Sequence, residues 1–324
     1  MKVKHIKVGK IPMIEVENAL GLKVTLCNVG ASIYSIYLNE DIMTLTPKNP
    51  NDFLLPTAYY GKTIGAITNR VKGGKVLIND KEYQMQLNEG DNTLHGGNFS
   101  LSNLIFSQKL NYGNNFFSVI FSFKKKKLKD GLPGNINYYI CYSINDSSND
   151  ILLDMKAVSD DDTVIALTNH SYFCLGDKNV NNLSLQINAS KYVVTDKDDL
   201  TPLEEKEVSH VLDFKKMKLI SKDLNNKEIQ SVKTKGYDHH YIFDDDNSPI
   251  ILENRKYRLT IETNFSGCQI YTDNYPDNII MTANENETFN RGVAIEPQDS
   301  PLDRKVIKKG QLYNRIIKYS FIQK

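Results

Sequence analysis

Apolar and polar residues alternate with a period of two along several short segments of this chain. In residues 82–87 apolar side chains occupy every second position, so one face of this segment should be buried in a sheet. Asn79-Asp80 is a turn signal, and it predicts a hairpin that joins this segment to residues 76–78. Further runs of β-branched and aromatic residues predict strands at residues 22–26, 32–38, 116–123, 137–142, 151–155, 191–195 and 258–262.

The sequence contains no long segment with the 3.6-residue period of a helix, no internal repeat and no obvious linker. We therefore predict one all-β domain that spans residues 1–324. The hydrophobic content of 40% is sufficient for a large core.

Composition and charge narrow the class of protein. A net charge of +1 does not favour a nucleic-acid or acidic-membrane partner. The four cysteines are far apart and lack CxxC spacing, which favours buried thiols over a disulfide framework or a zinc site. Neither the apolar run of a signal peptide nor a membrane-spanning run of ~20 apolar residues is found, so we expect a cytoplasmic protein.

Residues 291–303 place a carboxylate at the end of a predicted buried strand. Val293 and Ile295 would face one side of this strand, whereas Ala294 and Glu296 would face the other. The proline that follows Glu296 should stop the ladder there. A carboxylate that is rigid on one side and open to a ligand on the other is suited to act as a base. A solvated glutamate at a strand end is the simpler interpretation of this segment alone.

A second predicted strand, over residues 163–170, ends at His170. Alternation puts His170 on one face with Val164 and Ala166, and it puts Ile165 and Leu167 on the opposite face. The imidazole of His170 thus lies at the end of a predicted strand, as the carboxylate of Glu296 does.

Two polar loops carry further candidates for ligand binding. Asn69-Arg70 closes a glycine-punctuated loop, and its guanidinium could donate two hydrogen bonds to a polar ligand. Two glycines follow His95, so both the imidazole and the backbone could approach a ligand closely. A surface cation and a structural histidine remain the alternatives for these two motifs.

Two adjacent histidines follow Asp238 in a further short segment. On a strand His239 and His240 should face opposite ways, so they would not converge on one ion. We therefore expect no metal site.

Taken together, and in this order, the motifs closely resemble those of the aldose 1-epimerases, also called galactose mutarotases. The matching motifs are Asn69-Arg70 and residues 94–97, 169–173, 237–239 and 296–298. The resemblance covers roughly residues 10–320. It implies a large antiparallel β-sandwich, a supersandwich, with sugar bound across one concave sheet. It also implies that Glu296 is the general base, that His170 is the general acid, and that the substrate-binding residues are Asn69, Arg70, His95 and Asp238.

Several positions depart from the pattern expected for this family. Cys174 and His240 each stand where asparagine is common, and Pro297 stands where many members carry threonine. The loop of residues 196–204 has Thr-Pro-Leu in place of the usual Pro-Thr-Gly. Because the implied acid and base are present, these departures bear on sugar preference rather than on reaction type.

The implied reaction interconverts the α and β anomers of a free hexose of the glucose or galactose type. A base removes the proton of the C1 hydroxyl while an acid protonates the ring oxygen. The ring then opens, the C1–C2 bond rotates, and the ring closes on the other face. Since no redox step or covalent intermediate occurs, we expect no cofactor. The expected partner is a small aldose, and the expected assembly is a monomer or homodimer.

Three alternatives remain open at this stage. A hexose 6-phosphate epimerase of the same fold would need a basic phosphate pocket, and Lys62, Lys72 and Lys75 lie near Arg70 in the sequence. A glycoside hydrolase would use Asp238 with the glutamate of residues 291–303 as its carboxylate pair. A non-catalytic sugar-binding β-sandwich would need neither the acid nor the base in particular.

Overall fold

The computed structural model describes residues 1–230, 233–245, 248–275 and 278–324. Strands make up 47% of the structure and helices 7%. The strands pair antiparallel in three larger sheets and four two-stranded ladders within the described part of the chain. The prediction of an all-β antiparallel fold is confirmed.

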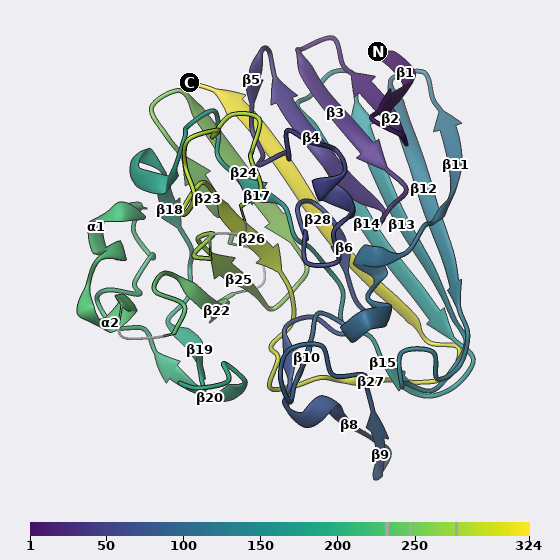
Figure 1. Cartoon of the computed structure of the whole chain (residues 1–324). Coiled ribbons are helices and arrows are strands. Elements are labelled where there is room, and N and C mark those ends of the chain that lie inside the picture. The colour runs from purple at the N-terminus through teal and green to yellow at the C-terminus, as the bar shows by residue number, and fades with distance from the viewer. Residues whose placement is uncertain (231–232, 246–247, 276–277) are drawn as a thin grey trace.

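The sheets combine strands from distant parts of the chain (Figure 1). The five-stranded sheet contains, in order, β1 (Lys2–Val8), β2 (Ile11–Glu17), β3 (Leu22–Cys27), β4 (Ser32–Leu38) and β5 (Asp41–Ile42). The nine-stranded sheet contains β11 (Ser107–Tyr112), β12 (Phe116–Lys125), β13 (Ile136–Asn145), β14 (Asp150–Ser159), β28 (Leu312–Gln323), β24 (Tyr257–Thr263), β23 (Ile250–Glu253), β18 (Ser184–Gln186) and β21 (Lys218–Leu219). The six-stranded sheet contains β17 (Tyr172–Phe173), β26 (Val293–Pro297), β25 (Gly267–Tyr271), β22 (Asp238–Ile242), β19 (Lys191–Thr195) and β20 (Pro202–Glu207).

Short ladders, two single-turn α-helices and five 3₁₀-helices of three residues each complete the described elements. The ladders pair β6 (Thr63–Ile64) with β16 (Thr168–Asn169), β7 (Arg70–Val71) with β10 (Thr93–Leu94), β8 (Lys75–Ile78) with β9 (Lys81–Gln84), and β15 (Thr163–Val164) with β27 (Val306–Ile307). The α-helices are α1 (Ser221–Leu224) and α2 (Lys227–Gln230). No helix among the described residues has both the length and the apolar composition to cross a membrane.

The nine-stranded sheet buries one face. Along β13, for example, Ile140 is fully buried whereas its neighbour Tyr139 is 45% exposed. The largest core cluster joins Ile140 to Val24 of β3 and Ile295 of β26, so the two smaller sheets pack on the same buried face. This layered arrangement is the predicted β-sandwich. Near its centre β28 pairs with β14 on one side and with β24 on the other.

The predicted hairpin is confirmed, with one strand shorter than expected. Asn79 and Asp80 join β8 to β9 with φ angles of 48° and 62°, as a type I′ turn requires. The second strand ends at Gln84, although the alternating pattern extends to residue 87.

The predicted strand over residues 163–170 is divided into β15 and β16. The backbone between them finds other partners, because Ala166 donates to the carbonyl of Ala66 and Leu167 donates to the hydroxyl of Tyr313. The two faces are nevertheless as predicted. Leu167 belongs to the largest core cluster, whereas Val164 belongs to a separate one.

Because one core cluster contains side chains from β2 through β28, we propose that the chain folds as a single domain. Urea unfolding followed by circular dichroism and by tyrosine fluorescence should then give coincident single transitions. Leu153→Ala should lower the free energy of unfolding by about 2–5 kcal/mol, since Leu153 is fully buried. The matched control is Leu152→Ala on the same strand, because Leu152 is 38% exposed and should lose much less. Two separate transitions would contradict the single domain.

Candidate active site

The six-stranded sheet forms the floor of the candidate site. In this sheet Glu296 on β26 lies opposite Gln269 on β25, and Gln269 lies opposite His240 on β22. Val293 and Ile295 pack into the largest core cluster, as the alternation predicted. The carboxylate of Glu296 therefore projects from the opposite face of the same strand.

The strand ends at the proline after Glu296, one residue later than predicted. Pro297 is the last residue of β26 and lies opposite Cys268. A proline lacks the N–H donor but keeps its carbonyl acceptor. That carbonyl accepts a hydrogen bond of 2.7 Å from the hydroxyl of Thr168.

Glu296 and His170 form a close buried pair. The register of β17 and β26 places Tyr172 opposite Ala294, so continuing it by two residues brings His170 opposite Glu296. The imidazole Nε2 lies 3.3 Å from the carboxylate Oε1, and the two residues are 4% and 2% exposed. Among the described residues, the imidazole Nδ1 and the carboxylate Oε2 have no hydrogen-bond partner. Two polar atoms of the pair are therefore free to bind a ligand.

Backbone and aromatic contacts hold the imidazole of His170 in place. Its backbone N–H donates to the carbonyl of Lys62, and its carbonyl accepts from the N–H of Gly61, each at 2.9 Å. The ring of Tyr59 stacks on the imidazole at 5.6 Å, and the ring of Tyr172 lies 4.9 Å from it. These rings also give the site apolar surfaces beside its acid and base.

Burial shifts the pKa values of Glu296 and His170 in opposite directions. It lowers the pKa of His170 to about 3, and it raises the pKa of Glu296 well above its ordinary value. The nearby charge of Asp238 raises the pKa of Glu296 further. At neutral pH the pair therefore holds one proton, either as imidazole with carboxylic acid or as imidazolium with carboxylate.

His95 joins this pair from the loop after β10. Its Nδ1 accepts a hydrogen bond of 3.3 Å from the backbone N–H of Asn69, so a neutral ring carries its proton on Nε2. The ring centroids of His95 and His170 are 5.4 Å apart. Burial lowers the pKa of His95 well below its ordinary value, and the charges of His170 and Arg70 lower it further. His95 is thus a neutral hydrogen-bond donor at the site.

Gln269 connects two residues that the sequence selected. The side-chain amide of Asn69 donates to the Gln269 carbonyl oxygen at 3.0 Å, and the Gln269 amide donates to Asp238 Oδ1 at 2.7 Å. The Asn69 oxygen also accepts from the N–H of Arg70 at 3.0 Å. Both ends of the Asn69 amide are therefore engaged within the protein. Burial raises the pKa of Asp238, and the charge of Arg70 opposes this.

Arg70 is held by a carboxylate that the sequence analysis did not select. Its Nε donates to Glu89 Oε2 at 2.6 Å, and its Nη2 donates to Glu89 Oε1 at 2.8 Å. The structure thus places all six predicted residues in one site and adds Glu89 and Gln269 to them. Nothing in the local sequence pattern indicated the partners of Gln269.

His239 and His240 face opposite ways, as predicted. His240 lies opposite Gln269 on the site face. The ring of His239 instead contacts the ring of Tyr192 at 5.7 Å, and its Nδ1 accepts from the N–H of Asp238. Within the residues that the structure describes, no group of three histidine, cysteine, aspartate or glutamate side chains could hold a metal ion.

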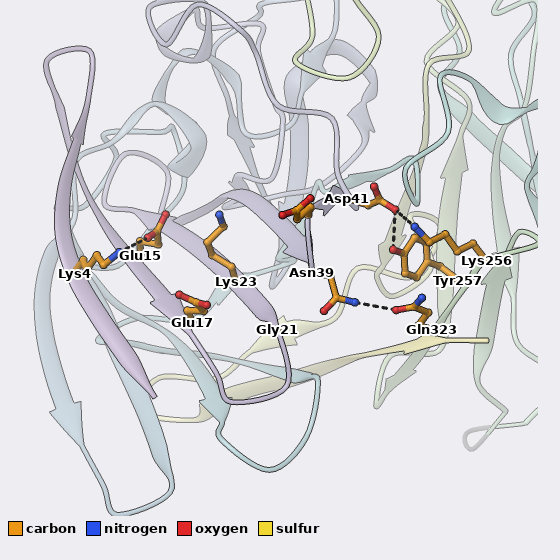
Figure 2. Close-up of a pocket in the computed structure, with 11 residues that line it drawn as sticks. Lys4, Glu15, Glu17, Gly21, Lys23, Asn39, Asp41, Lys256, Tyr257 and Gln323 are labelled. Atoms are coloured by element: carbon orange, nitrogen blue, oxygen red, sulfur yellow. Dashed lines mark hydrogen bonds and ion pairs between the residues drawn. The ribbon is translucent and has the colours of Figure 1, made fainter.

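One surface groove lies elsewhere, on the five-stranded sheet. It has a volume of about 700 Å³, and Lys4, Glu15 and Asp41 are among its lining residues (Figure 2). Four of its charged groups form two ion pairs, Lys4 with Glu15 and Asp41 with Lys256. No residue of the candidate site lines this groove. The chemistry therefore indicates the functional site better than the shape of the surface does.

The arrangement is suited to moving protons between neighbouring atoms of one ligand. A base and an acid stand 3.3 Å apart, and a guanidinium, an imidazole and a carboxylate lie around them. Such groups can orient several hydroxyls while a proton is taken from one oxygen and given to another.

Comparisons with known proteins agree with this chemistry. The model of the family described as aldose 1-epimerase matches residues 12–320. The aldose 1-epimerase of Haemophilus influenzae is 27% identical over 302 residues, which cover 89% of this chain and 86% of that protein. The galactose mutarotase of mouse is 24% identical over 291 residues, which cover 83% and 80%. The crystal structure of galactose 1-epimerase from Lactobacillus acidophilus has a TM-score of 0.90 at 26% identity and covers 100% of this chain and 99% of its own. Since the family model extends from the second strand to the last, this protein belongs to the aldose 1-epimerase family, whose members are isomerases that interconvert the anomers of sugars.

Proposed function

We propose that this protein interconverts the anomers of free hexoses of the glucose and galactose type, with Glu296 as base and His170 as acid. The observation that carries the proposal is the buried 3.3 Å contact between their reactive atoms. The two oxygens that exchange protons are both bonded to C1, so the base and the acid must act close together. The carboxylate pair of a glycoside hydrolase is instead separated by ~5–9.5 Å across the glycosidic bond.

Ring opening starts from imidazolium facing carboxylate. Glu296 takes the proton of the C1 hydroxyl, His170 gives its proton to the ring oxygen, and the C1–O5 bond breaks to form an aldehyde. This leaves neutral imidazole and carboxylic acid, the form that burial favours. After rotation about C1–C2, the C5 hydroxyl attacks the other face, His170 takes its proton, and Glu296 returns a proton to O1. The pair ends with the one proton that it had at the start.

The remaining residues would orient the sugar. Arg70 and His95 supply hydrogen-bond donors, and Asp238 supplies an acceptor for hydroxyl groups. Asn69 would act mainly through Gln269, because its amide is already engaged by protein groups. Holding the sugar in one orientation keeps C1 against the acid and the base.

Glu296→Gln keeps the shape of the side chain and removes the base. Catalysed anomer exchange should fall by ~10²-fold or more, whereas sugar binding should change little. His170→Asn should have a similar effect on turnover. The rates would be measured by polarimetry on fresh α-D-glucose and α-D-galactose. Glu82→Gln is the matched control, because Glu82 is exposed and forms an ion pair with Lys75 outside the site. Near wild-type turnover in Glu296→Gln would reject the assignment of the base.

The lowered pKa of His170 gives an expected pH profile. The efficiency kcat/KM should show no inflection at 6.5, the ordinary pKa of histidine; on the acid side it should fall only toward about 3, and on the alkaline side it should fall where the pair loses its single proton. At that lower pH the pair gains a second proton and loses its base. Exchange rates corrected for the uncatalysed reaction, measured across this range, would check the expectation. A clear inflection at 6.5 would show that His170 titrates as an exposed histidine does.

The substrate class can be tested against the alternatives in one buffer. Free glucose and galactose should be equilibrated faster than glucose 6-phosphate, and nitrophenyl glycosides should not be cleaved. Exchange spectroscopy between the two anomeric signals measures the first comparison, and absorbance of nitrophenol measures the second. Faster exchange of the phosphorylated sugar would favour the phosphosugar epimerase. Release of nitrophenol would favour the hydrolase. Sugar binding without any exchange would favour a non-catalytic binding protein.

A further inference from the structure

Glu89 holds the guanidinium of Arg70 at the edge of the site. The two parallel hydrogen bonds, of 2.6 and 2.8 Å, have the fork-to-fork geometry of a bidentate ion pair. The side chain of Arg70 is 12% exposed and that of Glu89 is 37% exposed. The pair is therefore buried on the arginine side and reaches solvent on the glutamate side.

Hydrogen bonds fix the loop that carries Glu89. Glu89 and Asn92 exchange backbone hydrogen bonds of 3.1 and 3.0 Å, and the Asn92 side chain accepts from the N–H of Gly73 at 3.0 Å. The side chain of Asn88 bonds to both the N–H and the carbonyl of Leu94. The carboxylate of Glu89 is thus presented to Arg70 by a fixed backbone rather than by a free loop.

This ion pair changes what Arg70 can offer to a ligand. A guanidinium has five N–H donors, and Glu89 occupies two of them, so three remain for sugar hydroxyls. The negative charge of Glu89 offsets the positive charge of Arg70, and the negative charge of the nearby Asp238 offsets it further. His95 is neutral, and the Glu296–His170 pair with its single proton has no net charge, so these groups give the site no net positive charge. Such a site suits uncharged hydroxyls and disfavours an anionic substituent.

The lysines close to Arg70 in the sequence do not supply a second cation to the site. Lys62 places its ammonium over the ring of Phe53, 4.9 Å from the ring centroid. Lys75 pairs with Glu82 at 3.1 Å.

Two other cations near Arg70 have partners of their own. Hydrogen bonds from Thr201 lower the pKa of Asp199, and the charge of Lys72 contributes to this shift. Arg304 donates to the backbone carbonyl of Arg70 at 2.7 Å, and it lines a separate hollow of about 710 Å³ with Thr68 and Asp299. Arg70 and the acid–base pair do not line that hollow.

We propose that Glu89 is both the positioning residue for Arg70 and the specificity determinant that makes this site select uncharged aldoses over sugars carrying a phosphate or carboxylate. This inference rests on the proposed function and names the residue responsible for its substrate class. The charge of Glu89 excludes anionic sugars, and its geometry aims the free donors of Arg70 at hydroxyl groups.

The test compares Glu89→Gln with the wild type and with Glu82→Gln, which removes the same charge from an exposed ion pair outside the site. The measured quantity is the ratio of catalysed anomer exchange for glucose 6-phosphate to that for glucose. Removing a charge beside the site should raise this ratio on the order of tenfold in Glu89→Gln. Inhibition of glucose exchange by glucose 6-phosphate should strengthen in parallel. The control should match the wild type in both respects.

Glu89→Asp separates charge from geometry. This variant keeps the negative charge but is too short to hold Arg70 in the same way, so it should keep the wild-type ratio while the KM for glucose rises. If Glu89→Asp raises the ratio as much as Glu89→Gln does, the role of charge is refuted. If Glu89→Gln leaves the ratio unchanged while the wild type equilibrates glucose, the inference fails and the proposed function stands. If the wild type equilibrates no free aldose, both fail.

A salt series on the wild type covers the case in which Glu89→Gln does not fold. Electrostatic exclusion weakens as salt shortens the Debye length from about 10 Å at 0.1 M to about 3 Å at 1 M. The ratio for glucose 6-phosphate to glucose should therefore rise with sodium chloride. A ratio that is flat across this range would overturn the proposal.

Discussion

The alternation of side chains along β26 fixes the position of the Glu296 carboxylate, the proposed base. Val293 and Ile295 are fully buried in the largest core cluster. Glu296 projects from the other face of β26 and lies opposite Gln269 on β25. A slip of one residue would bury the carboxylate in the core and expose two apolar side chains. The packing energy of the sandwich therefore holds Glu296 in register. The neighbours of β26 extend this constraint to His170 on one side and Gln269 on the other.

Two buried polar atoms of the candidate site are not satisfied by other groups of the described residues. His170 Nδ1 and Glu296 Oε2 are buried and lack partners among the described residues. Each such group costs about 1–3 kcal/mol of stability when it is left unpaired. The hydroxyls of a bound sugar could satisfy these atoms, so part of the binding energy would come from relieving a cost that folding imposed. Burial also disfavours the charged form of the pair, imidazolium with carboxylate. It therefore favours imidazole with carboxylic acid, which is the form that the proposed ring opening leaves.

Much of the fold and part of the site followed from local sequence pattern. Period-two alternation indicated the strands, and it placed Glu296 and His170 on faces opposite to core residues. Arg70 and His95 stood out because glycine-rich loops surround them. Gln269 could not be recognised in this way, since its role depends on β25 lying between β22 and β26. Glu89 reaches Arg70 only because β7 and β10 pair. The break between β15 and β16 arises from distant partners, Ala66 and Tyr313, that no local pattern contains.

β28 lies near the centre of the nine-stranded sheet, but the ribosome adds its residues after those of every other strand in that sheet. Its residues, Leu312–Gln323, separate β14 from β24, and Asp150 lies opposite Ser320 across the ladder. Until this segment emerges, the edges of β14 and β24 remain unpaired and offer templates for association with other chains. Contacts of such long sequence separation also slow folding. The nascent chain must therefore keep the two halves of one sheet apart until Leu312–Gln323 has been synthesised, and only then can the sheet close.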